Sequence, residues 1–214
     1  MITPTHFVIN AGLAHRLRSR PLLANPLRRR LFLLGGVAPD LGLFVMTLLA
    51  AAYYPLVDGL SRDETFRLIF DDLFYNAPAF VIAHNLLHAP LVLAGLAGIG
   101  AWLRRRTTRE RLGGALQAFA IGCAVHTALD IPVHHDDGPL LLFPFEWSVR
   151  YASPVSYYQS DHYGDIVEPI DLAITLVGLT VIAIAWARRR RRRHVRHDVA
   201  GDRLQADPDD VRHP

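Results

Sequence analysis

The chain has 214 residues, of which 51% are hydrophobic and 20% are charged, and its formal net charge is +3. All 23 of its basic residues are arginine, and 20 of them fall within residues 16–30, 104–111 and 188–212. Long apolar stretches separate these three blocks, which argues against an ordinary soluble domain with interspersed charges. The single cysteine, Cys123, excludes a disulfide framework and a cysteine-rich zinc site.

The chain begins with a segment that we expect to form a short amphipathic helix over residues 5–18, too short to cross a bilayer. Four longer apolar stretches follow, and each has the roughly 20 residues that a membrane-spanning helix needs. They cover about residues 31–54, 77–103, 112–133 and 166–187. We therefore predict an all-α integral membrane protein with four transmembrane helices, the short N-terminal helix and a structured outer loop.

The three arginine blocks predict how these spans are oriented. With four spans, all three blocks lie on one side of the membrane, and the two loops on the other side are acidic. The positive-inside rule assigns the arginine side to the cytoplasm, so both termini are expected to be cytoplasmic. The predicted membrane domain covers residues 1–187, and residues 188–214 form a basic tail that we expect to be disordered. Its arginines are expected to contact membrane lipids and not nucleic acid.

Ionisable side chains interrupt the predicted spans, where they are costly and usually functional. Asp40 lies in the first span, His84 and His88 lie in the second, and His126 and Asp130 lie in the third. With a helical rise of about 1.5 Å per residue, all five fall in one depth zone that is open toward the outer side. The i, i+4 spacing places the two histidines of the second span on one helix face, and the third span repeats this spacing.

These side chains predict a metal site. Imidazole nitrogen and carboxylate oxygen together favour a divalent ion, with zinc as the first choice and manganese or iron as alternatives that take more oxygen ligands. A bound ion would also offset the cost of placing carboxylates in the membrane. His134, which follows the third span, and His162 and Glu168, which come just before and within the fourth, are candidates for a rim that contacts a substrate.

Several short motifs resemble those of the bacterial inner-membrane YdjM-like proteins, which are described as membrane-bound metal-dependent hydrolases. More distantly, the order of His, Asp, His and His-x₃-Asp is similar to that of the zinc-dependent phospholipase C and S1/P1 nuclease group. The resemblance implies a bacterial inner membrane and metal-binding roles for Asp40, for His84 or His88, and for His126 and Asp130, with His6 as a further ligand. The matching motifs, spread over about residues 4–165, are Thr5-His6, Ala38-Pro39-Asp40, His84-Asn85-Leu86-Leu87-His88, His126-Thr127-Ala128-Leu129-Asp130 and the stretch from Leu141 to Trp147.

These features favour a metal-dependent hydrolase whose site opens to the periplasm and which acts on a phosphoester or a lipid-derived substrate. His88 or Asp130 would serve as general base beside the metal ion. Three other functions fit the same residues. They are a small transporter with a His and Asp proton relay, a b-type haem protein with histidine axial ligands, and a noncatalytic membrane protein whose polar groups pair with one another.

Overall fold

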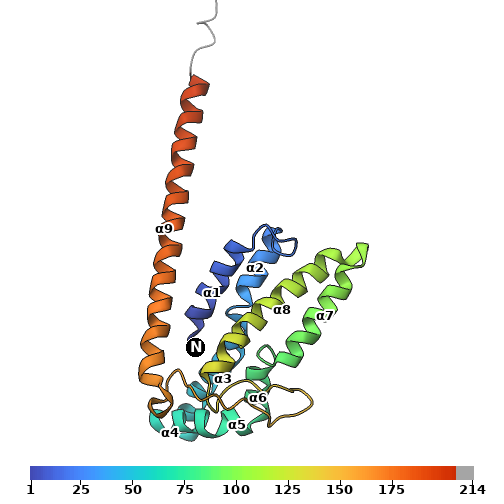
Figure 1. Ribbon diagram of the computed structural model, residues 1–214. Coiled ribbons are helices and arrows are strands. Elements are labelled where there is room, and N and C mark those ends of the chain that lie inside the picture. The colour runs from blue at the N-terminus through green and yellow to red at the C-terminus, as the bar shows by residue number, and fades with distance from the viewer. Residues whose placement is uncertain (206–214) are drawn as a thin grey trace, which may run out of the picture.

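The computed structural model describes residues 1–205, and over this range the chain is all-α and contains no strand. Figure 1 shows the arrangement of the helices. Two π-helical segments, η1 (Tyr54–Asp58) and η2 (Leu68–Leu73), follow α3 and α4. The α-helices are α1 (Thr3–Arg16), α2 (Pro26–Leu34), α3 (Ala38–Tyr53), α4 (Arg62–Arg67), α5 (Phe74–Asn76), α6 (Pro78–Asn85), α7 (Pro90–Arg104), α8 (Glu110–Asp130) and α9 (Gly164–Gln205).

Several of these helices are suited to cross a membrane. Three segments are long and apolar enough, namely Ala38–Asp58, Thr107–Val133 and Gly164–Arg188. A fourth candidate is the pair of α6 and α7, which is bent by 50° at the break between the two helices. The described residues thus contain three candidate spans, or four if the bent pair counts as one, which indicates a multi-pass membrane protein. The predicted all-α class is confirmed.

The first predicted span, residues 31–54, is not one continuous helix. It breaks at Gly35 and Gly36, between α2 and α3. A Cβ atom on Gly35 would lie 2.6 Å from a backbone nitrogen of α8, and one on Gly36 would lie 2.8 Å from a side-chain nitrogen of α1. Only glycine permits such close approach at this turn. Asp40 therefore lies in the first turn of α3, and the candidate span continues to Asp58.

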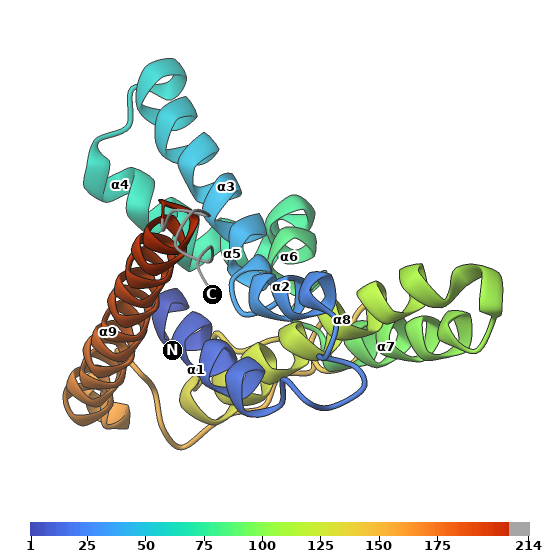
Figure 2. The ribbon, with the colours of Figure 1, turned by 90° about the horizontal axis from the view of Figure 1, so that it is seen from above.

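The predicted N-terminal helix is present as α1, but it does not lie on the surface. It packs against α2, α8 and α9, as the view from above shows (Figure 2). Its buried residues are Thr5, His6, Asn10 and Ala14, so the packed face is largely polar and not apolar. Asn10 Nδ2 donates two hydrogen bonds of 3.1 Å, one to a backbone oxygen of α2 and one to a backbone oxygen of α8. These bonds pair the amide nitrogen of Asn10 and fix α1 within the bundle.

Glycines let the helices around α8 approach closely. There is no room for a Cβ atom at Gly113 against the backbone of α7, or at Gly122 against the backbone of α2. The same holds for Gly42 of α3 against the backbone of α6. Small residues at helix contacts are typical of membrane bundles. This packing brings the start of α3, the end of α6 and the end of α8 together.

The two ends of the molecule differ in their arginine content. The α1–α2 loop, the α7–α8 turn and the C-terminal part of α9 point to the same end in Figure 1, and these segments contain the three arginine blocks. The helix α9 extends to Gln205, so residues 188–205 of the tail that was expected to be disordered are helical. Arginine is a good helix former and does not itself end a helix. Residues 206–214 lie outside the described part of the chain.

The outer loop predicted between the third and fourth spans covers residues 134–163 and lies at the opposite end together with α4, α5 and α6 (Figure 1). It contains an isolated β-bridge between Leu140 and Arg150. The Leu140 backbone N–H donates a 2.7 Å hydrogen bond to Asn85 Oδ1, at the end of α6. The loop is therefore structured and is attached to the end of α6, next to the helix break that contains His88.

Candidate metal centre

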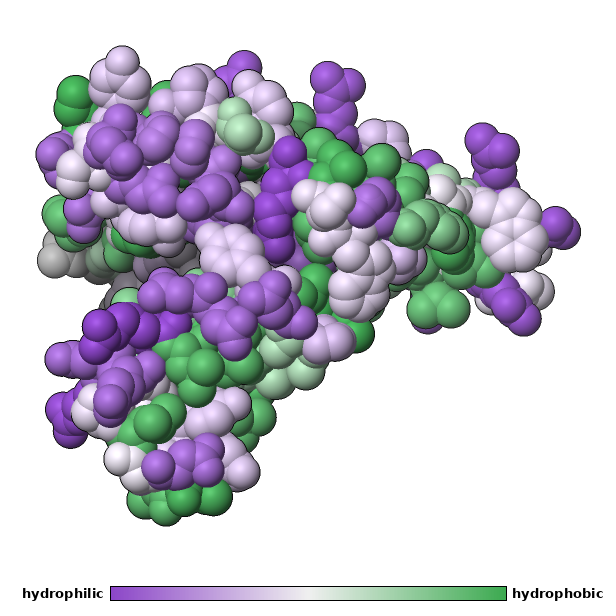
Figure 3. All heavy atoms as spheres, turned by 90° about the horizontal axis from the view of Figure 1, so that it is seen from below, coloured by the Kyte–Doolittle hydropathy of each residue, from purple (hydrophilic) through white to green (hydrophobic). Residues whose placement is uncertain are grey.

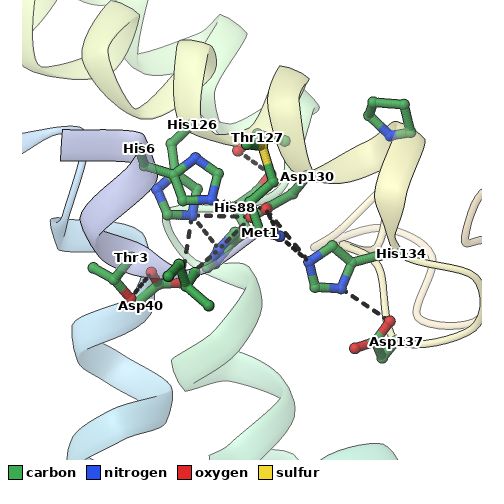
Figure 4. Close-up of polar contacts among 12 residues, drawn as sticks. Met1, Thr3, His6, Asp40, His88, His126, Thr127, Asp130, His134 and Asp137 are labelled. Atoms are coloured by element: carbon green, nitrogen blue, oxygen red, sulfur yellow. Dashed lines mark hydrogen bonds and ion pairs between the residues drawn. The ribbon is translucent and has the colours of Figure 1, made fainter. Parts of the chain in front are cut away.

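Four side chains from three separate segments converge near the end of the bundle that carries the outer loop. Asp40 comes from α3, His88 from the break between α6 and α7, and His126 and Asp130 from α8. One possible ligand atom from each lies within 4.8 Å of all the others. Figure 4 shows these side chains directed toward one another. Asp40 is partly exposed and the other three are buried, so the group is a buried His/Asp cluster that could hold a metal ion.

Backbone carbonyls orient the two histidine rings of this cluster. His88 Nδ1 lies 2.7 Å from the carbonyl oxygen of His84, and His126 Nδ1 lies 3.1 Å from that of Gly36. Because a carbonyl oxygen only accepts, each Nδ1 carries the hydrogen and donates it. In a neutral ring the Nε2 atom then has a free lone pair, and the two Nε2 atoms are 3.0 Å apart. Two facing lone pairs at this distance repel unless a cation or a proton lies between them.

The two carboxylates complete the set of four ligand atoms. Asp40 Oδ1 lies 3.4 Å from Nε2 of both histidines. Asp130 Oδ2 lies 3.0 Å from His126 Nε2 and 3.6 Å from His88 Nε2. A tetrahedral zinc site with bonds of about 2.0–2.1 Å has ligand atoms separated by about 3.3–3.4 Å. The separations that involve a histidine lie on both sides of this value, and all four atoms lie within 4.8 Å of one another, so the cluster could hold a small divalent cation.

The remaining carboxylate oxygens are held by neighbours. Thr3 Oγ1 donates a hydrogen bond to Asp40 Oδ2. Asp130 Oδ1 lies 2.9 Å from His6 Nε2 and 3.3 Å from His134 Nε2. Each aspartate thus directs one oxygen toward the cluster while the other contacts a supporting group. Such outer contacts orient metal ligands and are a usual part of metal sites.

His6, which was expected as a further ligand, lies in this supporting layer. Its ring stacks on the His126 ring, with 3.7 Å between the centroids and 21° between the planes. The start of α1 is fixed by Asp171 of α9, whose Oδ2 accepts a 2.8 Å hydrogen bond from the Ile2 backbone N–H. Our sequence reasoning assigned no role to Thr3. The three-residue spacing of Thr3 and His6, which places both on one face of a helix, is a signal that could have identified Thr3.

His84 is close to the cluster but does not belong to it. Its ring stacks on the His88 ring, with 4.5 Å between centroids, and within the described part of the chain neither of its nitrogens has a hydrogen-bond partner. The predicted i, i+4 pairing assumed a continuous helix through both residues. Pro90 begins a new helix, and Ala89 before it is extended, as is usual before proline. The break turns His88 toward His126 and leaves His84 beside Phe74, with 4.9 Å between those two ring centroids.

A cavity of about 1140 Å³ opens beside the cluster. Figure 3 views the molecule from the loop end and shows a notch between the lobe that contains α4 and the lobe that contains the start of α9. One wall of the cavity is polar and a second wall is apolar. The polar wall includes Asp40, His84, His88, Asp130 and His134, the apolar wall includes Leu43, Phe44, Phe66, Phe70 and Phe74, and the outer rim includes Asp136, Asp137, Tyr157, Tyr158 and Gln159.

Of the three predicted rim residues, only His134 lines this cavity. Its Nδ1 lies 2.9 Å from Asp137 Oδ1. Burial by itself lowers the pKa of His134, but the carboxylates of Asp130 and Asp137 outweigh burial and raise the pKa above its ordinary value. His162 instead stacks on a neighbouring histidine of the outer loop, 3.6 Å between centroids, and Glu168 is exposed on α9. The loop and the first turns of α9 direct both away from the cluster.

Comparison of the chain with protein-family models, with curated proteins and with solved structures gives no match. The geometry is therefore the basis for interpreting the site. It consists of two histidines and two aspartates that could hold a metal ion, a supporting layer from α1 and the outer loop, and a large cavity beside them.

Proposed function

We propose that this chain is a membrane-embedded, metal-dependent hydrolase of the YdjM-like type. Asp40, His88, His126 and Asp130 would hold one divalent ion, which is zinc in our proposal, with manganese or iron as the alternatives. The observation that carries the proposal is the convergence of two Nε2 atoms and two carboxylate oxygens within 4.8 Å of one another, with the histidine–histidine and histidine–carboxylate separations at 3.0–3.6 Å. Two carboxylates and two neutral rings also balance a divalent charge, which offsets the cost of burying carboxylates in a membrane.

Because four side chains fill a tetrahedral site, the metal ion would have to accept a fifth ligand. It would then supply a water nucleophile at neutral pH and would polarise the oxygen of a phosphoester or another ester. The chain's own groups would move the proton. Of the two candidates for the general base, His88 is the less suitable, because its Nδ1 donates to a carbonyl and its Nε2 faces the cluster. Asp130 Oδ1 is directed away from the cluster and lies 2.9 Å from His6 Nε2, 2.9 Å from the Met1 amino nitrogen and 3.3 Å from His134 Nε2, and we assign this oxygen as the proton acceptor. His134, with Asp137 beside it, would pass the proton to the cavity.

The proposal includes a location and a direction. A bacterial inner membrane would surround the apolar helices, with the arginine-rich end in the cytoplasm. The cavity rim from the outer loop would then face the periplasm, where a phosphoester or lipid-derived substrate would enter. The position of the three arginine blocks at one end, opposite residues 134–163, supports this direction.

Metal analysis of the purified protein tests the proposal directly. The chain is purified in detergent, supplied with zinc, manganese or iron, freed of excess metal, and assayed for metal content and for hydrolysis of para-nitrophenyl phosphoesters. We expect stoichiometric metal and hydrolysis in the wild type, and loss of both in Asp40→Ala, His88→Ala and Asp130→Ala. His84→Ala is the matched control for metal content, because this ring is buried in the same segment but lies outside the cluster. Wild-type protein that stays metal-free under metal-replete conditions would overturn the proposal and favour the noncatalytic alternative.

A further inference from the structure

One face of α3 runs from the candidate metal centre into the apolar part of the cavity. Asp40, Phe44 and Thr47 follow one another at i, i+4 and i+7, and all three line the cavity together with Leu43. Over these seven residues a helix rises about 10 Å. The wall therefore changes from a carboxylate in the cluster to apolar side chains along a single helix.

A second stripe, made of phenylalanines, lines the same cavity from α4, η2 and α5. Phe66, Phe70 and Phe74 are spaced four residues apart, and the first two rings are 4.6 Å apart. Phe74 is the member that contacts His84. At the other end of the stripe, Phe66 is 63% exposed, and Phe44 on α3 is 57% exposed. The cavity thus has a polar end at the cluster and an apolar end with open aromatic side chains.

His84 provides an independent sign of a ligand at the polar end. Its side chain is 7% exposed and lines the cavity, yet neither ring nitrogen has a hydrogen-bond partner among the described residues. Buried polar atoms are normally paired, so an unpaired imidazole next to a cavity lacks a partner that a bound molecule would supply. This missing partner would lie beside the cluster and next to Phe74, where the polar and apolar walls meet.

We propose, on the premise of the hydrolase function above, that the substrate is a membrane lipid with a phosphoester at the junction of its apolar chain and its polar head. The chain lies between the α3 face and the phenylalanine stripe. The phosphoester lies at the metal cluster, where the N–H of His84 donates to one of its oxygens. The head faces the polar rim formed by the outer loop.

The reaction balances with water as the only co-reactant. The water oxygen forms a bond to phosphorus as the P–O bond of the ester breaks. One proton of the water goes to the leaving oxygen, and the other leaves through Asp130 Oδ1. Nothing is oxidised or reduced.

Two chromogenic esters that differ only in chain length test this assignment. Methyl para-nitrophenyl phosphate and hexyl para-nitrophenyl phosphate have the same leaving group, and both are used with zinc-loaded protein below micelle-forming concentrations. Each buried methylene favours binding by about fourfold. We expect kcat/KM to be at least about thirtyfold higher for the hexyl ester. Equal kcat/KM values in an active protein would overturn the lipid proposal and leave the hydrolase function standing.

Substitutions in the apolar and polar walls test which residues cause the dependence of kcat/KM on chain length. Phe66→Ala and Phe70→Ala should lower the ratio of kcat/KM for the hexyl ester to kcat/KM for the methyl ester at least about fivefold. Leu48→Ala is the matched control, because Leu48 lies on α3 but does not line the cavity. His84→Ala should lower kcat/KM for both esters at unchanged metal content, and His84→Gln should restore part of it. Unchanged ratios in both phenylalanine variants would overturn the proposed chain site.

A binding measurement separates this proposal from the hydrolase function. Hexylphosphonate should stabilise the zinc-loaded protein against heat more than methylphosphonate does, and the difference should disappear in Phe66→Ala. If this difference is seen but neither ester is hydrolysed, the amphipathic site stands and the hydrolase function fails. If the two phosphonates stabilise the protein equally, the amphipathic site fails regardless of turnover.

Discussion

The two neighbouring histidines of the second span allow a matched test of metal binding. His88→Ala removes one of the four ligand atoms, whereas His84→Ala removes a ring that lies outside the cluster. The two side chains are 1% and 7% exposed, so each substitution leaves a buried cavity of similar size. Both variants are therefore expected to lose about 2–5 kcal/mol of packing stability. Only His88→Ala should also lose the response to metal.

The size of that response follows from linkage. A ligand that binds only the folded protein at a free concentration of about 100 times its Kd adds about 2.7 kcal/mol of stability. For a chain of this length about 1 kcal/mol shifts Tm by about 2–4 °C, so zinc should raise the wild-type Tm by about 5–11 °C over the chelated protein. His84→Ala should show the same increment from a lower starting Tm. A hundredfold weaker affinity in His88→Ala would leave only about 0.4 kcal/mol, or about 1–2 °C.

Thermal unfolding in detergent, after chelation and again after readdition of zinc, measures these increments. An increment in His88→Ala as large as that of the wild type would refute the assignment of this residue as a ligand. A wild type whose Tm does not change with zinc would refute the metal site as a whole. The short His–Asp distances would then be ion pairs within a noncatalytic protein.

Three further substitutions test the residues around the cluster. Thr3→Val removes the hydroxyl that donates to Asp40 Oδ2, so it should weaken zinc binding about tenfold in a dye-competition titration. Thr3→Ser keeps the hydroxyl and should bind zinc as the wild type does. Equal zinc affinities of Thr3→Val and the wild type would contradict the role of this hydroxyl. Asp171→Ala removes the acceptor that fixes the start of α1 and should lower zinc affinity about 10–100-fold with every ligand retained; an unchanged affinity would show that α1 needs no such anchor. Gly122→Ala places a Cβ against the backbone of α2 and should cost about 1–3 kcal/mol in thermal unfolding, whereas Gly95→Ala, which meets no atom within 4 Å, should not lower Tm.

The sequence was sufficient to predict the fold class and the composition of the cluster. Apolar stretches of span length are conspicuous, and ionisable residues within them are rare enough to identify the site. All four cluster residues were among the predicted ligands, because a common depth requires only helix rise and residue number. The structure also places the two remaining candidates, His6 and His84, in contact with cluster histidines.

The breaks in the helices were not predictable in the same way. Hydropathy over about 20 residues averages across a two-residue turn, so residues 31–54 looked like one span. The turn at Gly35 and Gly36 depends on how closely α1 and α8 approach, which is a tertiary property. The position of α1 was missed for a related reason. Its buried face is polar, and a polar face predicts burial only when its hydrogen-bond partners on other helices are known.

These breaks form the site as well as interrupt the helices. Asp40 follows one break, His88 lies in another, and Asp130 is the last residue of α8. The last carbonyls of a helix have no partner within that helix. The carbonyl of His84, near the end of α6, is one of these, and it accepts the Nδ1 hydrogen of His88 and so directs Nε2 toward His126. In a continuous helix this carbonyl would accept a backbone hydrogen bond, and the bend between α6 and α7 would be absent. His88 would then lie away from His126, although every ligand side chain would still be present.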